Sequence, residues 1–164
     1  MTTTILSSYA PLPGRLNCIS NLIKVAREQR LHFSKLDDMG NYVLAIDTDQ
    51  RKLVYQKNGS DSSSCTIIDL QDLKECIVKK QYNSIHAGEL NKRRLSDFLR
   101  GLFLHLRFRN ESPTVTIPLF EGQKDRQDDL EQLEEKAKVW ERIVSKLLPK
   151  KNHVKVQQDA ELLP

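Results

Sequence analysis

Apolar residues recur at steps of three and four in two segments of the chain, a spacing typical of amphipathic helices. The first segment runs from Leu16 to Leu31, with most of its charged residues falling between the apolar ones. The apolar residues of the second segment are Leu130, Leu133, Ala137, Trp140, Val144 and Leu147. We therefore expect an amphipathic helix within residues 14–36, and a C-terminal helix that starts near residue 130 and stops before Pro149.

Between the two helices the period of the pattern changes to two, which indicates strands. The predicted strands cover residues 41–47, 51–57, 65–70, 73–79, 102–109 and 114–120. The clearest one alternates Leu104 and Leu106 with His105 and Arg107, as a half-buried antiparallel strand does. Pro118 places the last strand at a sheet edge or a bulge, because proline donates no backbone hydrogen bond. The polar stretch at 82–95 predicts a long loop.

The grouping of the strands between two helices predicts an antiparallel α+β fold. With 164 residues the chain has the size of one domain with one core. We divide it into a flexible N-terminus at 1–13, an amphipathic helix at 14–36, a body of strands and C-terminal helix at 40–149, and a disordered tail at 150–164. The apolar stripe of the N-terminal helix has three candidate partners: the body of its own chain, a second copy in a homodimer, and lipid.

Composition places the chain among globular proteins and argues against secretion. Apolar residues make up 38% and charged residues 29%, with a formal net charge of +4. No apolar run approaches the ~18 residues that span a bilayer, and the N-terminus lacks the features of a signal peptide. Cys18, Cys65 and Cys76 have no metal-ligand spacing, so we expect buried reduced thiols in a cytoplasmic protein, with one disulfide and a free thiol as the alternative.

Five segments together resemble a known arrangement of hairpins and one helix. They are the strand Lys52-Leu-Val-Tyr55, the strand–turn–strand segment 65–76, the strand from Leu102, Val115-Thr-Ile-Pro118 and the helix that carries Trp140. Hairpins closed by one C-terminal helix make residues 41–148 similar to the pleckstrin-homology-like superfold, and to its bacterial members in particular. The resemblance implies a twisted barrel or sandwich that the helix caps at one end. It implies a docking surface and no shared catalytic activity. Similar bacterial chains often carry membrane helices before this module, where this chain has only the amphipathic helix.

We assign no catalytic, metal-binding or cofactor-binding residue. His32, His86, His105 and His153 are scattered along the chain, and none has a second ligand-type residue at a metal-like spacing. The carboxylate pairs Asp47 with Asp49 and Asp128 with Asp129 have the spacing of turns and helix caps. The chain also lacks a nucleophile elbow and a glycine-rich phosphate loop. We therefore expect no enzymatic activity, and an enzyme with an unrecognised site is the third hypothesis for function.

Basic residues are the feature with the most functional content. A candidate anion- or partner-binding patch consists of Lys79, Lys80, Lys92, Arg93, Arg94, Arg100, Arg107 and Arg109. It forms only if the loop folds near the outer face of the strand from Leu102, and solvated surface charge is the alternative interpretation. Nucleic acid is disfavoured as a partner, because Phe103 is the only aromatic residue expected on that face.

Two hypotheses for function follow. The first is a non-catalytic interaction module that docks a protein partner, and the second is a module that binds an anionic membrane surface through the basic patch. Phosphoinositide-binding pleckstrin-homology domains carry cations beside the turn between their first two strands. The matching turn here, Asp47 to Lys52, sets two carboxylates beside two cations, which argues against an inositide site.

Overall fold

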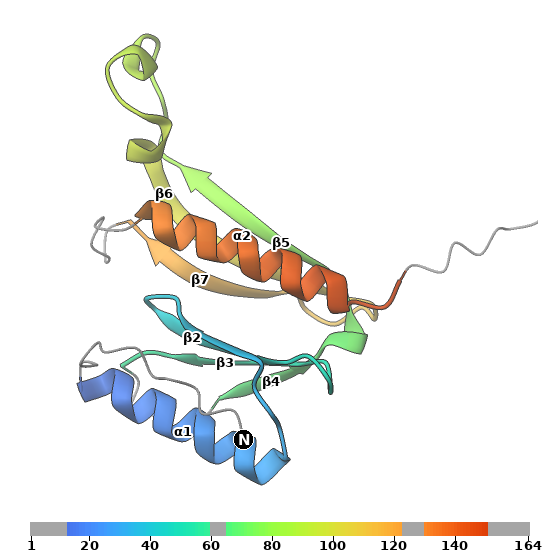
Figure 1. Ribbon diagram of the computed structural model, residues 1–164. Helices are drawn as coiled ribbons and strands as arrows, with labels where there is room; N and C mark the ends of the chain where they lie inside the picture. Colours follow the sequence, from blue (N-terminus) through green and yellow to red (C-terminus); the bar gives the residue numbers. More distant parts are fainter. Residues whose placement is uncertain (1–12, 60–64, 123–129, 151–164) are drawn as a thin grey trace, which may run out of the picture.

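The computed structural model describes residues 13–59, 65–122 and 130–150, with seven strands and two long helices (Figure 1). The helices are α1 (Pro13–Gln29) and α2 (Leu130–Leu147), and the short 3-10 helices are η1 (Leu70–Asp72), η2 (Glu89–Asn91) and η3 (Leu95–Phe98). The strands are β1 (Lys35–Asp38), β2 (Tyr42–Asp47), β3 (Lys52–Lys57), β4 (Thr66–Asp69), β5 (Leu73–Tyr82), β6 (Leu99–Phe108) and β7 (Val115–Glu121). The α+β class and the six predicted strands are confirmed.

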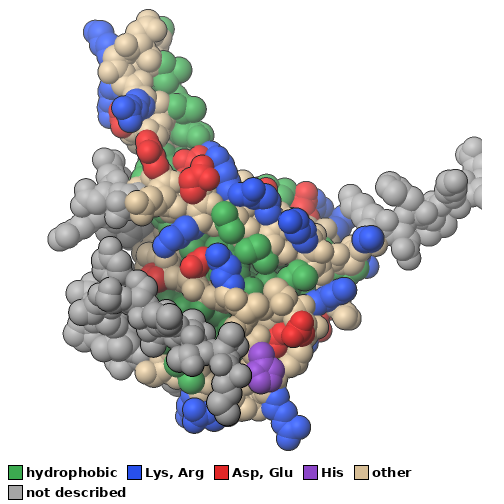
Figure 2. All heavy atoms as spheres, in the orientation of Figure 1, with side chains coloured by type: hydrophobic (Ala, Val, Ile, Leu, Met, Phe, Trp, Pro, Cys, Tyr) green, Lys and Arg blue, Asp and Glu red, His purple; other side chains and the backbone are tan. Residues whose placement is uncertain are grey.

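The strands form two antiparallel sheets, one in the order β1-β2-β3-β4 and the other in the order β5-β6-β7. Figures 1 and 2 show that the segment between β5 and β6 rises out of the body. The two sheets do not join into a closed barrel within the described residues, so that part of our expectation is wrong. The reason lies at η1, where Asp69 accepts a hydrogen bond from the Gln71 N–H and the chain turns out of the first sheet before β5 begins. Pro118 lies in β7, which is an edge strand as predicted.

The N-terminal helix is shorter than the predicted span of 14–36. It ends at Gln29, and Arg30 follows in a left-handed conformation with φ of 55°. Residues 35–38 then form β1, which pairs with β2. Pro13, which falls in the predicted flexible N-terminus, is instead the first residue of α1, where its missing N–H costs no helical hydrogen bond. The rest of the predicted flexible N-terminus, and residues 151–164 of the predicted tail, lie outside the described residues.

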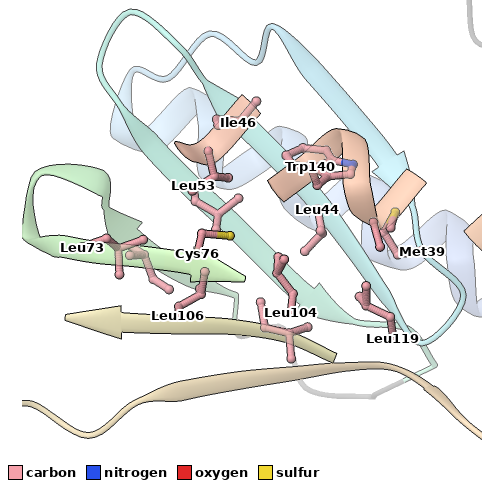
Figure 3. Close-up of a cluster of buried hydrophobic side chains, with 14 of the residues drawn as sticks. Met39, Leu44, Ile46, Leu53, Leu73, Cys76, Leu104, Leu106, Leu119 and Trp140 are labelled. Atoms are coloured by element: carbon pink, nitrogen blue, oxygen red, sulfur yellow. The ribbon is translucent and has the colours of Figure 1, made fainter. Parts of the chain in front are cut away.

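The main core fills the space between the two sheets and α2 (Figure 3). Its fully buried large side chains include Leu44 and Leu53 from the first sheet, Leu104 and Leu106 from the second, and Trp140 from α2. These side chains point into one interior although they come from four different elements of the chain, β2, β3, β6 and α2. The inward face predicted for the strand from Leu102 is therefore confirmed, and Trp140, from the apolar stripe of the predicted C-terminal helix, is fully buried.

A second, smaller cluster lies on the outer face of the first sheet. Cys18 and Leu22 of α1 pack there against Val43, Ala45 and Val54 of the central strands. Because β2 is covered on both faces, five of its six residues are buried. The apolar stripe of α1 thus packs on its own domain, and a homodimer through this helix stays a prediction.

Helix α2 is bonded to both sheets, at a side where no strand of one sheet pairs with a strand of the other among the described residues. Its Trp140 Nε1 donates to Asp37 Oδ2 of β1 at 2.9 Å, and its Glu141 carboxylate accepts the backbone N–H of Val78 on β5. The helix therefore packs on β5 and β6 of the second sheet and is hydrogen-bonded to β1 of the first. This is the closing role that the sequence predicts for the C-terminal helix, although α2 closes an open pair of sheets and no barrel.

Candidate interaction surfaces

Residues 83–98, between β5 and β6, form a projection from the body (Figure 1). The backbone N–H of Asn83 donates to the Phe98 carbonyl at 2.8 Å, and Phe98 itself is buried, so the base of the projection is fixed. Further out, Glu89 accepts the backbone N–H of His86 at 3.1 Å, and Asp97 accepts that of Arg94 at 3.1 Å. The predicted loop is therefore a folded element with its own backbone caps.

The projection carries exposed apolar side chains that the sequence analysis did not identify. Six large hydrophobic side chains are exposed within the described residues, and four of them lie on the projection or on the residue that leads into it. These four are Tyr82 at 38%, Ile85 at 36%, Leu90 at 55% and Leu95 at 49% exposure. The sequence does hold an apolar residue every few positions in this stretch, but these residues follow neither a helix nor a strand period. The many polar residues around them led to the prediction of a plain polar loop.

The eight basic residues of the candidate patch do not form one surface. Lys79 and Lys80 lie on β5, Lys92, Arg93 and Arg94 on the projection, Arg100 and Arg107 on β6, and Arg109 just after β6. Strand β6 has ten residues, so its two ends lie ~30 Å apart. The patch therefore divides into a group around the projection and a group at the far end of β6.

Carboxylates neutralise part of both groups. Lys80 pairs with Glu134 of α2, and this pairing raises the pKa of the Lys80 ammonium. Arg107 pairs with Glu75 at 3.1 Å on the outer face of the second sheet. These pairs lower the positive potential that we expected from the sequence. They therefore argue against one continuous patch that would bind an anionic headgroup.

A groove of about 600 Å³ lies where β5 and the end of α2 diverge. Its lining residues are Lys74, Glu75, Cys76, Ile77, Ser145, Lys146, Leu148, Pro149 and Lys150. Arg109 reaches the same place, because its guanidinium donates to the Pro149 carbonyl at 3.2 Å. The three lysines are exposed, whereas the one acidic residue, Glu75, already pairs with Arg107. The groove therefore has a cationic rim, assembled from residues that lie far apart in the sequence.

One wall of the groove is the free edge of β5. Among the described residues this strand pairs with β6 on one side only, through partners such as Cys76 with Leu106 and Ile77 with His105. Where α2 passes closest, the edge is occupied, since the Val78 N–H donates to Glu141. From Ile77 back to Lys74 the strand borders the groove.

His105 lies on the outer face of the second sheet, as predicted, and its Nδ1 is 3.2 Å from Thr116 Oγ1. Burial, with help from Lys79 and Arg107, lowers the pKa of its imidazole. Across residues 13–59, 65–122 and 130–150, no group of three or more His, Cys, Asp or Glu side chains is placed to hold a metal ion.

The three cysteines are free thiols. Cys18 and Cys76 are buried as expected, whereas Cys65 is only half-buried. Burial raises the pKa of Cys76 to about 12 and that of Cys18 to about 11, so both thiols stay protonated at neutral pH. They are therefore poor nucleophiles in the folded protein.

These raised pKa values predict that the protein loses stability in alkali. Below pH 9, the ordinary pKa of the thiol, Cys76 is protonated in both the folded and the unfolded chain. Above it the unfolded chain releases the proton first, so the free energy of unfolding falls between pH 9 and about 12, by up to ~1.4 kcal/mol per pH unit for one thiol. Urea titrations of the wild type and Cys76→Ala between pH 8 and pH 11 measure this, with the shallower slope expected in the variant. Equal slopes would contradict the burial of the neutral thiol.

No helix within the described residues is long and apolar enough to cross a membrane. The chain matches no family model, no curated protein and no solved structure. Its α+β class therefore rests on the structure itself, and the pleckstrin-homology-like resemblance stays a prediction.

Proposed function

We propose that the protein is a non-catalytic interaction module that docks a short, extended, acidic segment of a protein partner in the groove between β5 and α2. The observation that carries the proposal is the combination, in one hollow, of a strand edge and a cationic rim. The order of two antiparallel sheets and a C-terminal helix agrees with the docking role that the pleckstrin-homology-like resemblance implies, and that resemblance is part of the proposal.

The strand edge favours an extended ligand. A peptide that adds to an edge strand gains backbone hydrogen bonds, and the pockets beside the strand select its side chains. Four residues of β5, Lys74 to Ile77, border the groove, a length of ~13 Å. The Glu141 carboxylate on Val78 marks the end of the accessible edge. Because the accessible edge of β5 has this length, we expect it to pair with about four to five residues of the ligand.

The charges favour an acidic ligand. Lys74 lies on the strand side of the groove, Lys146 and Lys150 lie on the helix side, and Arg109 reaches the end of α2. Since Arg107 already pairs with Glu75, no unpaired carboxylate among the lining residues opposes a negatively charged segment. The free thiols support, as part of the same proposal, a reducing compartment such as the cytoplasm.

A direct test uses labelled peptides that alternate glutamate with valine, with a lysine-for-glutamate peptide as the control ligand. Fluorescence anisotropy should detect binding of the acidic peptide and not of the basic one. N-methylation of alternate amides of the acidic peptide should weaken its binding, because it removes backbone hydrogen-bond donors. The double variant Lys74→Glu/Lys146→Glu should lower the affinity about tenfold or more, because two attractions become repulsions.

The matched control variant is Lys24→Glu/Lys57→Glu, which reverses two lysines outside the groove lining. It should leave the peptide affinity within about twofold of the wild type, since distant exposed charges are screened by salt. If acidic and basic peptides bind alike, or if both double variants bind as the wild type does, the groove is not the docking site.

A further inference from the structure

We infer that the projection at residues 83–98 is a second docking element, which lies in the interface of an anionic lipid bilayer. Its evidence is independent of the groove. The first line of evidence is the exposure of Leu90 at 55% and Leu95 at 49%, on the two 3-10 helices of the projection, and Ile85 and Tyr82 are exposed as well. An isolated exposed leucine needs no explanation, but four large apolar side chains within fourteen residues form a patch of the kind that marks an interaction site.

Packing inside the projection does not require these side chains. Its base is closed by Phe98, which is buried, and the Arg93 guanidinium lies 4.7 Å from the centre of the Phe98 ring. The outer part is held by the backbone caps from Glu89 and Asp97. Since other residues fix the conformation, the exposed leucines are available for an external apolar surface.

The charge of the same region selects an anionic surface. Residues 79–100 contain six lysines and arginines and two carboxylates, and of the six cations Lys80 pairs with Glu134 of α2. Both carboxylates, Glu89 and Asp97, accept backbone N–H groups, so they are bound within the projection. The Arg94–Glu131 pair, at 3.8 Å, is highly exposed on both sides and does little to hold Arg94 away from another anion.

The distribution of the side chains favours a bilayer over a protein cleft. Figure 2 shows hydrophobic side chains along one flank of the projection, and Lys and Arg side chains along the opposite flank and near the tip. An element that is amphipathic in this way lies in the plane of the interface, with the apolar side at the acyl boundary and the long cationic side chains extending to the lipid phosphates. Each such cation strengthens the attraction to an anionic leaflet.

The two docking surfaces can be occupied together. The groove lies at the Lys74 end of β5, whereas the projection begins after Tyr82 at its other end, ~25–30 Å away along the strand. Bilayer binding by the projection would therefore leave the groove open to a protein segment, and each surface can be tested without altering the other.

The test is co-sedimentation of the full chain with phosphatidylcholine vesicles and with vesicles of phosphatidylcholine and phosphatidylserine at 3:1, at low and at physiological salt. We expect binding to the anionic vesicles only, weaker at the higher salt. Leu90→Ser/Leu95→Ser should lower the affinity for anionic vesicles about tenfold, because two half-exposed side chains lose their apolar contact. Lys92→Gln/Arg94→Gln should lower it about tenfold and reduce the salt dependence.

Two matched variants serve as controls. Ile67→Ser replaces an apolar side chain of 38% exposure on β4, in the other sheet, and Lys24→Gln/Lys57→Gln removes two cations from α1 and β3. Both should bind anionic vesicles as the wild type does, and the projection variants should bind the acidic peptide unchanged. Failure to bind anionic vesicles at either salt would overturn the inference. So would vesicle binding that the two serine substitutions leave unaltered, or that Ile67→Ser weakens equally.

Discussion

Replacing Trp140 with alanine should lower the free energy of unfolding by about 3–5 kcal/mol. The ring is fully buried in the core between the two sheets, so its removal leaves a large cavity. It also removes the hydrogen bond from Trp140 Nε1 to Asp37. The Lys35 ammonium, 6.0 Å from the centre of the ring, loses its contact with the ring as well. Urea unfolding, followed by circular dichroism, measures the change.

Trp140→Phe separates the two contributions. Phenylalanine keeps most of the buried apolar surface but donates no hydrogen bond, so we expect a smaller loss of about 1–2 kcal/mol. Asp37 retains the ammonium of Lys35 at 3.3 Å as a partner, which limits the penalty. A loss below about 1 kcal/mol for Trp140→Ala would contradict the closing role of α2.

The same contact explains why β1 escaped sequence analysis. The strand has the sequence Lys35-Leu-Asp-Asp38, with one apolar residue among four, and all four are half-buried. Its stability as a strand comes from pairing with β2 and from the bond between Asp37 and Trp140, which are 103 positions apart in the chain. No local pattern encodes that partner. The longer strands and α2 were predictable, because each has one face in the core and therefore a regular apolar period.

The predicted end of the N-terminal helix was wrong for a related reason. Leu31 and Phe33 continue the spacing of α1, yet they follow the left-handed Arg30 and lie outside the helix. Leu31 belongs to the smaller cluster on the outer face of the first sheet, and Phe33 packs against it. Periodicity records which residues are buried and not the backbone conformation that buries them. The turn itself is held by a hydrogen bond from the Leu31 N–H to the Ala26 carbonyl at 2.8 Å, which no side-chain pattern announces.

The candidate sites were the least predictable part. Cations that are neighbours in the sequence were grouped into one patch, but β6 carries Arg100 and Arg107 toward opposite ends of a ten-residue strand. In contrast, Lys74 and Lys146 face one groove from elements 72 positions apart. Loop residues have no period to reveal exposure, so the apolar side chains of the projection became visible only with its fold. What sequence could supply was the composition of the basic region, and not its geometry.

Asp47→Ala should lower the free energy of unfolding by about 2–4 kcal/mol, an effect large for a residue at the end of a strand. Asp47 is 1% exposed, and its two carboxylate oxygens accept different backbone N–H groups: that of His32 at 2.8 Å and that of Gln50 at 2.9 Å. One bond anchors the connection from α1 to β1, and the other closes the turn from β2 to β3. Alanine would leave both N–H groups without their acceptor, and urea unfolding measures the cost.

Asp49→Ala is the matched control, since Asp49 is exposed in the same turn and its loss should change stability by less than about 0.5 kcal/mol. Asp47→Asn should fall between the two, because the amide has one acceptor oxygen and can keep one of the two hydrogen bonds. Hydrogen exchange adds a spatial readout: in Asp47→Ala, the amides of both His32 and Gln50 should lose protection. If only the Gln50 amide responds, the carboxylate acts as a local turn cap and does not tie α1 to the first sheet.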